Sequence, residues 1–113
     1  MVTIEDFRTL ALSFPGAVEQ PHFEKTSFRV NKKIFATLSE PAKKACLLFS
    51  PVDQSVFCAY DKEVIYPVPN KWGQKGATFV DLTKVKKTML RDALRVAYCN
   101  AAPKEFARKL HRK

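Results

Sequence analysis

The sequence is poor in the residues that make up metal and redox sites. It contains two histidines and three cysteines, and no two cysteines form a C-x-x-C pair. Metal sites built from these residues need closer spacing of the ligands than this chain offers. We therefore expect no metal and no cofactor. We expect the thiols of Cys46, Cys58 and Cys99 to be free and buried, as in a reducing compartment.

Long apolar runs are also absent. No run approaches the roughly 20 residues that a helix needs to cross a bilayer. The first ten residues, MVTIEDFRTL, carry two acidic residues and no basic segment before an apolar stretch, unlike a secretory signal. These features predict a cytoplasmic protein with no membrane partner.

Catalytic patterns are missing as well. The chain has three glycines in 113 residues and no glycine-rich loop of the kind that holds nucleotide phosphates. It has no Ser/His/Asp arrangement and no signature of paired carboxylates. We therefore expect a protein that is not an enzyme.

Positive charge is in excess, with a net charge of +9, and it is unevenly distributed. Residues 1–60 contain seven Lys/Arg and six Asp/Glu, a net charge of +1, whereas residues 61–113 contain thirteen and five, a net charge of +8. A one-sided positive field attracts polyanions and speeds their encounter with the protein. The charge distribution therefore favours a nucleic acid or an acidic protein as the partner.

The apolar pattern predicts one α+β domain over residues 1–113. Helices are expected at 3–14, 51–60 and 84–101, and strands at 26–30, 33–39, 45–49, 63–68 and 77–82. Thr3 with Asp6, and Ser50 before Pro51, are typical of helix N-termini, and Pro103 favours a last short helix. This order indicates a two-layer sandwich, an antiparallel sheet of about five strands with helices packed on one face.

Four segments of the chain carry a family resemblance. They are Phe14-Pro15-Gly16 after the first helix, SFRVNKKIFATL, VPNKWGQKGATFVDL and DALRVAY. With these segments in this order, the chain resembles the MmcQ/YjbR family of small bacterial proteins. The resemblance implies a CyaY-like fold and DNA binding, with a double-wing arrangement.

The segment 84–101 places four cations on one side of the expected helix. At about 100° per residue, Lys84, Lys87, Arg91 and Arg95 lie within an arc of roughly 80° and form a ridge about 16 Å long. The N-terminus of a helix is the positive end of its dipole, so lysines there are electrostatically unfavourable for the helix. They also add to the positive charge that an anion would meet. The ridge is either a solvated helix face or a surface that follows nucleic-acid phosphates.

The segment between the last two expected strands adds an aromatic residue to this charge. Lys71 and Lys75 flank Trp72, the only tryptophan, and Gly73 and Gly76 permit close approach of a ligand backbone. We expect a loop here, next to the basic helix. A tryptophan beside a sheet edge is more often a core anchor; otherwise it is a platform on which an unpaired base stacks.

The turn of the first hairpin is the third basic element. It contains Arg29, Lys32 and Lys33, which we expect to form a second wing of the nucleic-acid-binding surface. The alternative is an ordinary charged turn that faces solvent.

Two functions are compatible with these features. The first is a non-catalytic nucleic-acid-binding module that contacts the phosphate backbone with little sequence preference. The alternative is a domain that binds a small anion or an acidic protein and has no nucleic-acid role. We expect a monomer in either case, and the sequence favours neither DNA nor RNA, and neither single nor double strands.

Iron handling is a further class, because frataxin is a fold relative of the family. Iron binding needs a cluster of hard oxygen donors on one surface. Glu5, Asp6 and Glu19 offer such donors, but against an overall surplus of cations. Charge therefore disfavours iron binding.

Overall fold

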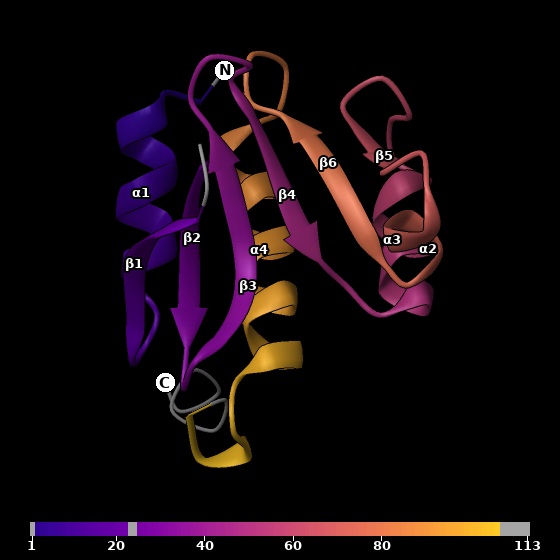
Figure 1. Ribbon diagram of the computed structural model, residues 1–113. Helices are drawn as coiled ribbons and strands as arrows, with labels where there is room; N and C mark the ends of the chain where they lie inside the picture. Colours follow the sequence, from indigo (N-terminus) through magenta and orange to yellow (C-terminus); the bar gives the residue numbers. More distant parts are fainter. Residues whose placement is uncertain (1, 23–24, 107–113) are drawn as a thin grey trace.

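Six strands form one antiparallel sheet in the order β1-β2-β3-β4-β6-β5 (Figure 1). The computed structural model describes residues 2–22 and 25–106. The strands are β1 (Ala17–His22), β2 (Lys25–Val30), β3 (Lys33–Ser39), β4 (Lys44–Leu48), β5 (Ile65–Pro67) and β6 (Ala77–Asp81). The helices are α1 (Ile4–Leu12), α2 (Pro51–Cys58), α3 (Lys71–Gln74) and α4 (Lys87–Ala101). The predicted α+β sandwich is confirmed, with one strand more than expected.

The additional strand is β1, which the sequence pattern did not reveal. Its sequence, AVEQPH, contains a proline and no regular alternation of apolar residues. Strand β1 is an edge strand that pairs only with β2. Pro21, which has no N–H to donate, therefore removes no hydrogen bond to a second neighbouring strand. Gly16, with a φ of 73°, turns the chain from α1 into this strand.

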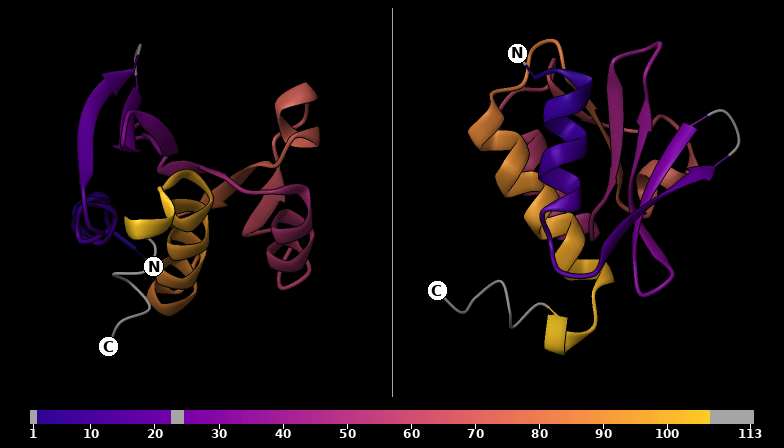
Figure 2. Two further views of the ribbon diagram at one scale, coloured as in Figure 1. Left: turned by 90° about the horizontal axis from the view of Figure 1, so that it is seen from below. Right: turned by 90° about the vertical axis from the view of Figure 1, so that its left-hand side faces the viewer.

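Helices α1 and α4 contact each other and cover one face of the sheet (Figure 2). The predicted capping box at the start of α1 is present, since Asp6 N donates to Thr3 Oγ1 at 3.0 Å and Thr3 N donates to Asp6 Oδ2 at 3.2 Å. Leu90, Ala93 and Leu94 of α4 are fully buried, and α4 packs mainly on β3. The amphipathic pattern of both helices therefore builds the core.

Helices α1 and α4 do not cover the opposite face of the sheet, which we call the open face. Residues that pair directly in antiparallel strands share a face, and side chains alternate along each strand. This rule puts Arg29, Ile34, Cys46, Leu48, Tyr66 and Phe79 on the open face. Exposure agrees with the rule, because Leu48 is 38% exposed while its neighbour Leu47 is buried.

Helices α2 and α3 lie together at the β5 end of the sheet. Helix α2 contacts β5, and α3 contacts β6. Gln54 of α2 links the two, since its Nε2 donates to the carbonyls of Gly73 at 2.8 Å and Ala77 at 3.0 Å. The sequence predicted a loop in place of α3.

Helix α4 begins later than predicted, and the final helix is described only in part. Lys86 is the N-cap of α4 and has no side-chain capping bond. Residues 104–106 are helical, and the rest of the short helix expected after Pro103 lies outside the described residues. None of the described helices has both the length and the apolar character needed to cross a membrane.

Candidate nucleic-acid interface

The turn between β2 and β3 presents three of the predicted cations. Asn31 and Lys32 have φ values of 49° and 70°, as in a two-residue type I′ hairpin turn. Arg29 and Lys33 flank this turn, and Nε of Arg29 donates to Ser27 Oγ at 3.0 Å. The predicted hairpin is confirmed, and its basic residues lie together near its tip.

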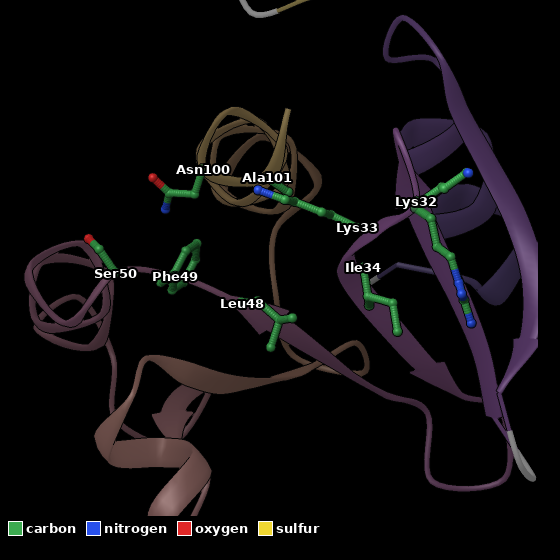
Figure 3. A pocket seen from close by; sticks show the side chains of 9 residues that line it. Lys32, Lys33, Ile34, Leu48, Phe49, Ser50, Asn100 and Ala101 are labelled. Atoms are coloured by element: carbon green, nitrogen blue, oxygen red, sulfur yellow. The ribbon is translucent and has the colours of Figure 1, made fainter. Parts of the chain in front are cut away.

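A cleft of about 700 Å³ opens beside this turn, between the hairpin and the C-terminal end of α4 (Figure 3). We call it the hairpin cleft. Its lining combines the hairpin cations, apolar side chains and two uncharged polar side chains: Arg29, Lys32, Lys33, Ile34, Leu48, Phe49, Ser50, Asn100 and Ala101. No aspartate or glutamate is among these lining residues, so an anion would meet only cations and neutral groups there.

Helix α3 is a single turn held by local polar contacts. The side chain of Asn70 accepts a hydrogen bond from Trp72 N at 2.8 Å. A Cβ atom on Gly73 would lie 1.7 Å from the carbonyl oxygen of Val68, so only glycine fits there. The glycine predicted to favour a ligand's approach instead lets α3 pack against its own chain.

The side chain of Trp72 lies on the surface. It is 66% exposed, which excludes the core-anchor alternative. Lys75 Nζ lies 5.6 Å from the centroid of the Trp72 ring, within cation–π distance, and the neighbouring Lys71 is exposed. The turn therefore presents an accessible indole together with two cations.

The hairpin cleft and α3 border the same end of the sheet. Leu48, which lines the cleft, pairs with Ala77 of β6, and Phe49 N donates to the Gly76 carbonyl at 3.1 Å. We define the hairpin–α3 surface as the cations and the tryptophan of the hairpin and α3, two elements that lie on opposite sides of β4 (Figure 1): Arg29, Lys32, Lys33, Lys71, Trp72 and Lys75. Within the described residues, no ion pair joins any of its five cations to a carboxylate.

The cations of α4 lie elsewhere, along a groove of about 600 Å³ between α4 and α1. Lys87, Arg91 and Arg95 line this α1–α4 groove, as their helical spacing predicts. Lys87 Nζ is 3.8 Å from Asp6 Oδ1 of α1, and Asp92 lines the same groove. Two carboxylates therefore reduce the positive potential of this ridge.

The expected single surface is not what the structure shows. The α1–α4 groove is on the face of the sheet that these two helices cover. Helix α3 instead packs on β6, next to the edge strand β5. Lys84 is in a third place, because it precedes α4 and lines a smaller cleft of about 260 Å³ with Asp61 and Tyr60. The expectation that the ridge includes Lys84 and adjoins the tryptophan segment is therefore wrong.

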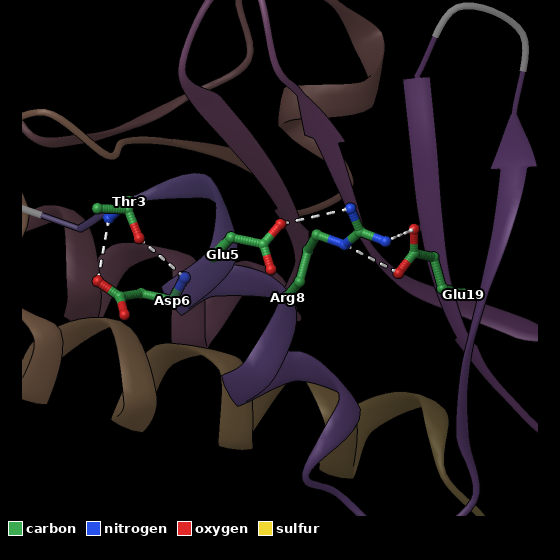
Figure 4. Close-up of polar contacts among 5 residues, drawn as sticks. All are labelled: Thr3, Glu5, Asp6, Arg8 and Glu19. Atoms are coloured by element: carbon green, nitrogen blue, oxygen red, sulfur yellow. Dashed lines mark hydrogen bonds and ion pairs between the residues drawn. The ribbon is translucent and has the colours of Figure 1, made fainter.

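The acids considered as iron ligands are engaged in other contacts (Figure 4). Arg8 binds Glu19 through Nη2 at 2.9 Å and Nε at 3.2 Å, and its Nη1 is 3.7 Å from Glu5. Asp6 caps α1 and faces Lys87. These carboxylates join α1 to β1 and α4. Within the described part of the chain, no group of three or more His, Cys, Asp or Glu side chains is placed to hold a metal ion.

The three cysteines are half-buried and form no disulfide, so they are less buried than predicted. Burial raises the pKa of each thiol above its usual value, with the greatest burial at Cys46. Thiols with raised pKa values stay protonated near neutral pH and are poor nucleophiles. This environment is consistent with structural cysteines.

One group on the open face was missed by the sequence reasoning. Lys44 Nζ lies 5.4 Å from the ring centroid of Tyr66 and 5.0 Å from that of Phe79. The two rings meet edge to face, with their centroids 5.8 Å apart. An aromatic residue in each of two strands was a usable signal, but the pairing of β5 with β6 had to be known first.

Comparisons with known proteins agree with this fold. The family model described as YjbR matches residues 12–100. The crystal structure of Deinococcus radiodurans protein DR2400, with a DUF419 domain, is similar with a TM-score of 0.73 and 23% identity, covering 87% of this chain and 77% of that one. No curated protein matches the chain. Because the family match spans well over half of the sequence, the chain belongs to the YjbR family.

Proposed function

We propose that this protein is a non-catalytic nucleic-acid-binding module that holds single strands on its hairpin–α3 surface. The observation that carries the proposal is the exposed Trp72 beside Lys75, at the end of the sheet where the hairpin cations also lie. Aromatic side chains on which bases stack, combined with cations that contact phosphates, are the usual components of single-strand binding sites. The two wings are the β2–β3 hairpin and α3.

The exposed indole favours single strands over duplexes. Stacking of an unpaired base on an aromatic side chain contributes about 1–3 kcal/mol per base, and every base has a face to offer. In a duplex those faces are covered by neighbouring bases, so Trp72 would gain little from it. The cations contact phosphates, which are the same in every sequence. We therefore expect binding with little sequence preference.

The lack of carboxylate partners at the hairpin–α3 surface supports phosphate binding. A cation paired with an acid must give up that interaction before it can hold a phosphate, and the acid repels the incoming strand. Within the described residues, Arg29, Lys32, Lys33, Lys71 and Lys75 have no such partner. Their field is therefore available to a polyanion.

Fluorescence of Trp72 tests the proposal directly, because the chain contains one tryptophan. We expect an oligo(dT) strand to quench this fluorescence at low salt and a duplex of equal length to quench it less. If about four phosphates are contacted, log affinity should fall with log salt at a slope of about −3, since each contact on a single strand contributes about −0.7.

A polyanion without bases is the control. Inorganic polyphosphate should compete for the cations and quench Trp72 much less than oligo(dT) does. Equal quenching by polyphosphate would contradict base stacking. If neither quenching nor a change in the anisotropy of a labelled oligo(dT) appears at low salt, the nucleic-acid proposal fails.

A further inference from the structure

The hairpin cleft exists because β3 bends away from β4. The pairing of β2 with β3 shifts register between Phe28, which faces Ala36, and Arg29, which faces Ile34, so Phe35 is an extra residue in β3. A bulge of this kind bends its strand, and bulges are frequent next to functional sites. The ladder between β3 and β4 ends at Ala36 and Leu47, and the cleft begins where it ends (Figure 3).

One wall of the cleft is cationic. Lys33 extends from the hairpin towards Asn100 and Ala101 at the end of α4 (Figure 3). Arg29 and Lys32 also line the cleft, but Arg29 pairs with Ile34 on the open face and Lys32 points away from Lys33 (Figure 3). The φ of Lys32 is positive, 70°, a backbone conformation that favours glycine.

One carboxylate, that of Asp53, contacts the lining of the cleft. Asp53 accepts hydrogen bonds from Ser50 Oγ at 2.9 Å and Asn100 Nδ2 at 3.2 Å, two side chains that line the cleft. It forms no ion pair with a described lysine or arginine. The lining itself therefore contains cations and no carboxylate.

The remainder of the cleft is largely apolar. Ile34, Leu48 and Phe49 lie between the hairpin and the start of α2. Leu48 is 38% exposed, which is high for a leucine within a strand. A hydrated inorganic anion would contact the lysines and leave this apolar surface in water, whereas an anion with an apolar body would cover it.

We propose that the hairpin cleft binds a small organic anion, a carboxylate or phosphate carried on a compact apolar or aromatic body. The anionic group lies against Lys33, and the body lies against Ile34 and Leu48. The volume of about 700 Å³ suits a small molecule, since such sites usually measure about 300–1,000 Å³. The cleft shares its cations with the hairpin–α3 surface, but binding of a small anion there requires neither Trp72 nor a nucleic acid.

Titration of the ¹⁵N-labelled protein with phenyl phosphate tests the proposal. We expect the largest amide shifts at Leu48, Asn100 and Ala101. Inorganic phosphate lacks the apolar body and benzyl alcohol lacks the charge, so each should bind at least about tenfold more weakly. Benzoate is the carboxylate arm, and comparison with phenyl phosphate shows which anionic group the cations prefer.

Two substitutions separate the parts of the site. Lys33→Gln should weaken both phenyl phosphate and inorganic phosphate by about fivefold. Leu48→Gln should weaken phenyl phosphate and leave inorganic phosphate unchanged. Leu48 lies outside the hairpin–α3 surface, so Leu48→Gln should leave the Trp72 quenching by oligo(dT) unchanged, whereas Lys33→Gln removes one phosphate contact and should weaken it. The small-ligand and nucleic-acid proposals can therefore fail independently.

Lys32 and Lys43 provide a matched pair. Both are exposed turn lysines with positive φ, 70° and 52°, so glycine removes the same charge and relieves the same backbone strain at either position. Only Lys32 lines the hairpin cleft. Lys32→Gly should weaken phenyl phosphate by about threefold, Lys43→Gly should not, and neither should lower the melting temperature.

Three results would overturn the inference. The first is equal affinity for phenyl phosphate and inorganic phosphate, because the apolar side chains would then have no role. The second is a shift pattern centred on the α1–α4 groove. The third is a lower melting temperature of Lys33→Gln with unchanged affinity, which would show that Lys33 only stabilises the negative end of α4.

Discussion

Two surfaces of the molecule carry the predicted cations, and they differ in their acidic neighbours. In the α1–α4 groove, Lys87 faces Asp6 at 3.8 Å, and Asp92 lies between Arg91 and Arg95 in the sequence. On the hairpin–α3 surface, the five cations have no described carboxylate partner. The difference teaches that a count of lysines and arginines does not give the local field, because long-range packing decides which acids come near.

The largest effect on stability is expected from substitution of Gly76, the glycine between α3 and β6. Gly76 has a φ of 116°, and a Cβ atom there would lie 1.8 Å from the Phe49 carbonyl oxygen. Gly76→Ala should therefore destabilise the fold by about 3 kcal/mol or more, because the obstacle is backbone. Urea unfolding at equilibrium measures this loss.

Gly16→Ala is the matched control for that substitution. Gly16 also has positive φ, but its nearest obstacle is the side chain of Phe106, at 2.7 Å. A side chain can move aside, so the loss should be about 1 kcal/mol. Equal losses of stability in Gly16→Ala and Gly76→Ala would mean that the close backbone approach at Gly76 does not fix the position of α3.

Neutralising two cations on each surface tests the comparison itself. Lys71→Gln/Lys75→Gln removes two unpaired cations, so the salt slope for oligo(dT) should become less negative by about 1.4 and the affinity should fall about tenfold. Lys87→Gln/Arg91→Gln removes the same charge from the α1–α4 groove and should change the slope by less than about 0.5. Anisotropy of a labelled oligo(dT) across a salt series measures both.

The opposite ranking of the two double variants would contradict the comparison. If the α1–α4 groove variant loses more affinity than the α3 variant, the ridge of α4 is the main nucleic-acid-binding surface, as the sequence alone had predicted. The acids of the groove would then have to separate from Lys87 when a strand binds.

Trp72→Ala should have a smaller effect, and on binding only. Because the indole is 66% exposed, its removal should change the free energy of unfolding by less than about 0.5 kcal/mol. Affinity for oligo(dT) should fall about fivefold or more through lost stacking, and affinity for a duplex should change less. A large loss of stability in thermal unfolding would instead assign the indole a structural role.

Much of this architecture could be predicted from local sequence. The capping pair Thr3 and Asp6, the turn at Asn31–Lys32 and the N-cap Ser50 each act within four residues, and all three are present. Strand β1 was missed because its sequence lacks alternation and contains Pro21. At the two helix caps and the turn, local sequence preference and tertiary packing favour the same structure. In β1, local preference does not favour a strand, and the strand forms because it pairs with β2.

The candidate site was less predictable, because it depends on contacts between distant segments. A helical wheel correctly aligned Lys87, Arg91 and Arg95, but it included Lys84, which precedes the start of α4 at Lys87. The wheel also contains no information on Asp6, which is about 80 residues away in sequence and reaches Lys87 through the packing of α1 on α4. The hairpin cleft likewise requires the bulge at Phe35, which changes the pairing of β3.

The smallest effect concerns the ion pair that distinguishes the α1–α4 groove. The amide and hydroxyl groups of Thr3 lower the pKa of the Asp6 carboxyl below its usual value of 3.8, and Lys87 adds a smaller contribution in the same direction. A carboxyl with a lowered folded-state pKa stabilises the fold above its unfolded pKa, and this stabilisation is lost as the pH falls through the folded value. Asp81 behaves in the same way through its hydrogen bonds with Thr83.

The fall in stability between neutral pH and pH below 3.8 should therefore be smaller in Asp6→Asn than in the natural chain. Lys87→Gln should leave that fall almost unchanged, because Thr3 is the main cause of the shift and the pair with Lys87 is exposed. Urea midpoints of the three proteins at the two pH values measure this. If Lys87→Gln reduces the fall as much as Asp6→Asn does, the ion pair is stronger than its exposure implies, and the α1–α4 groove is correspondingly less available to a polyanion.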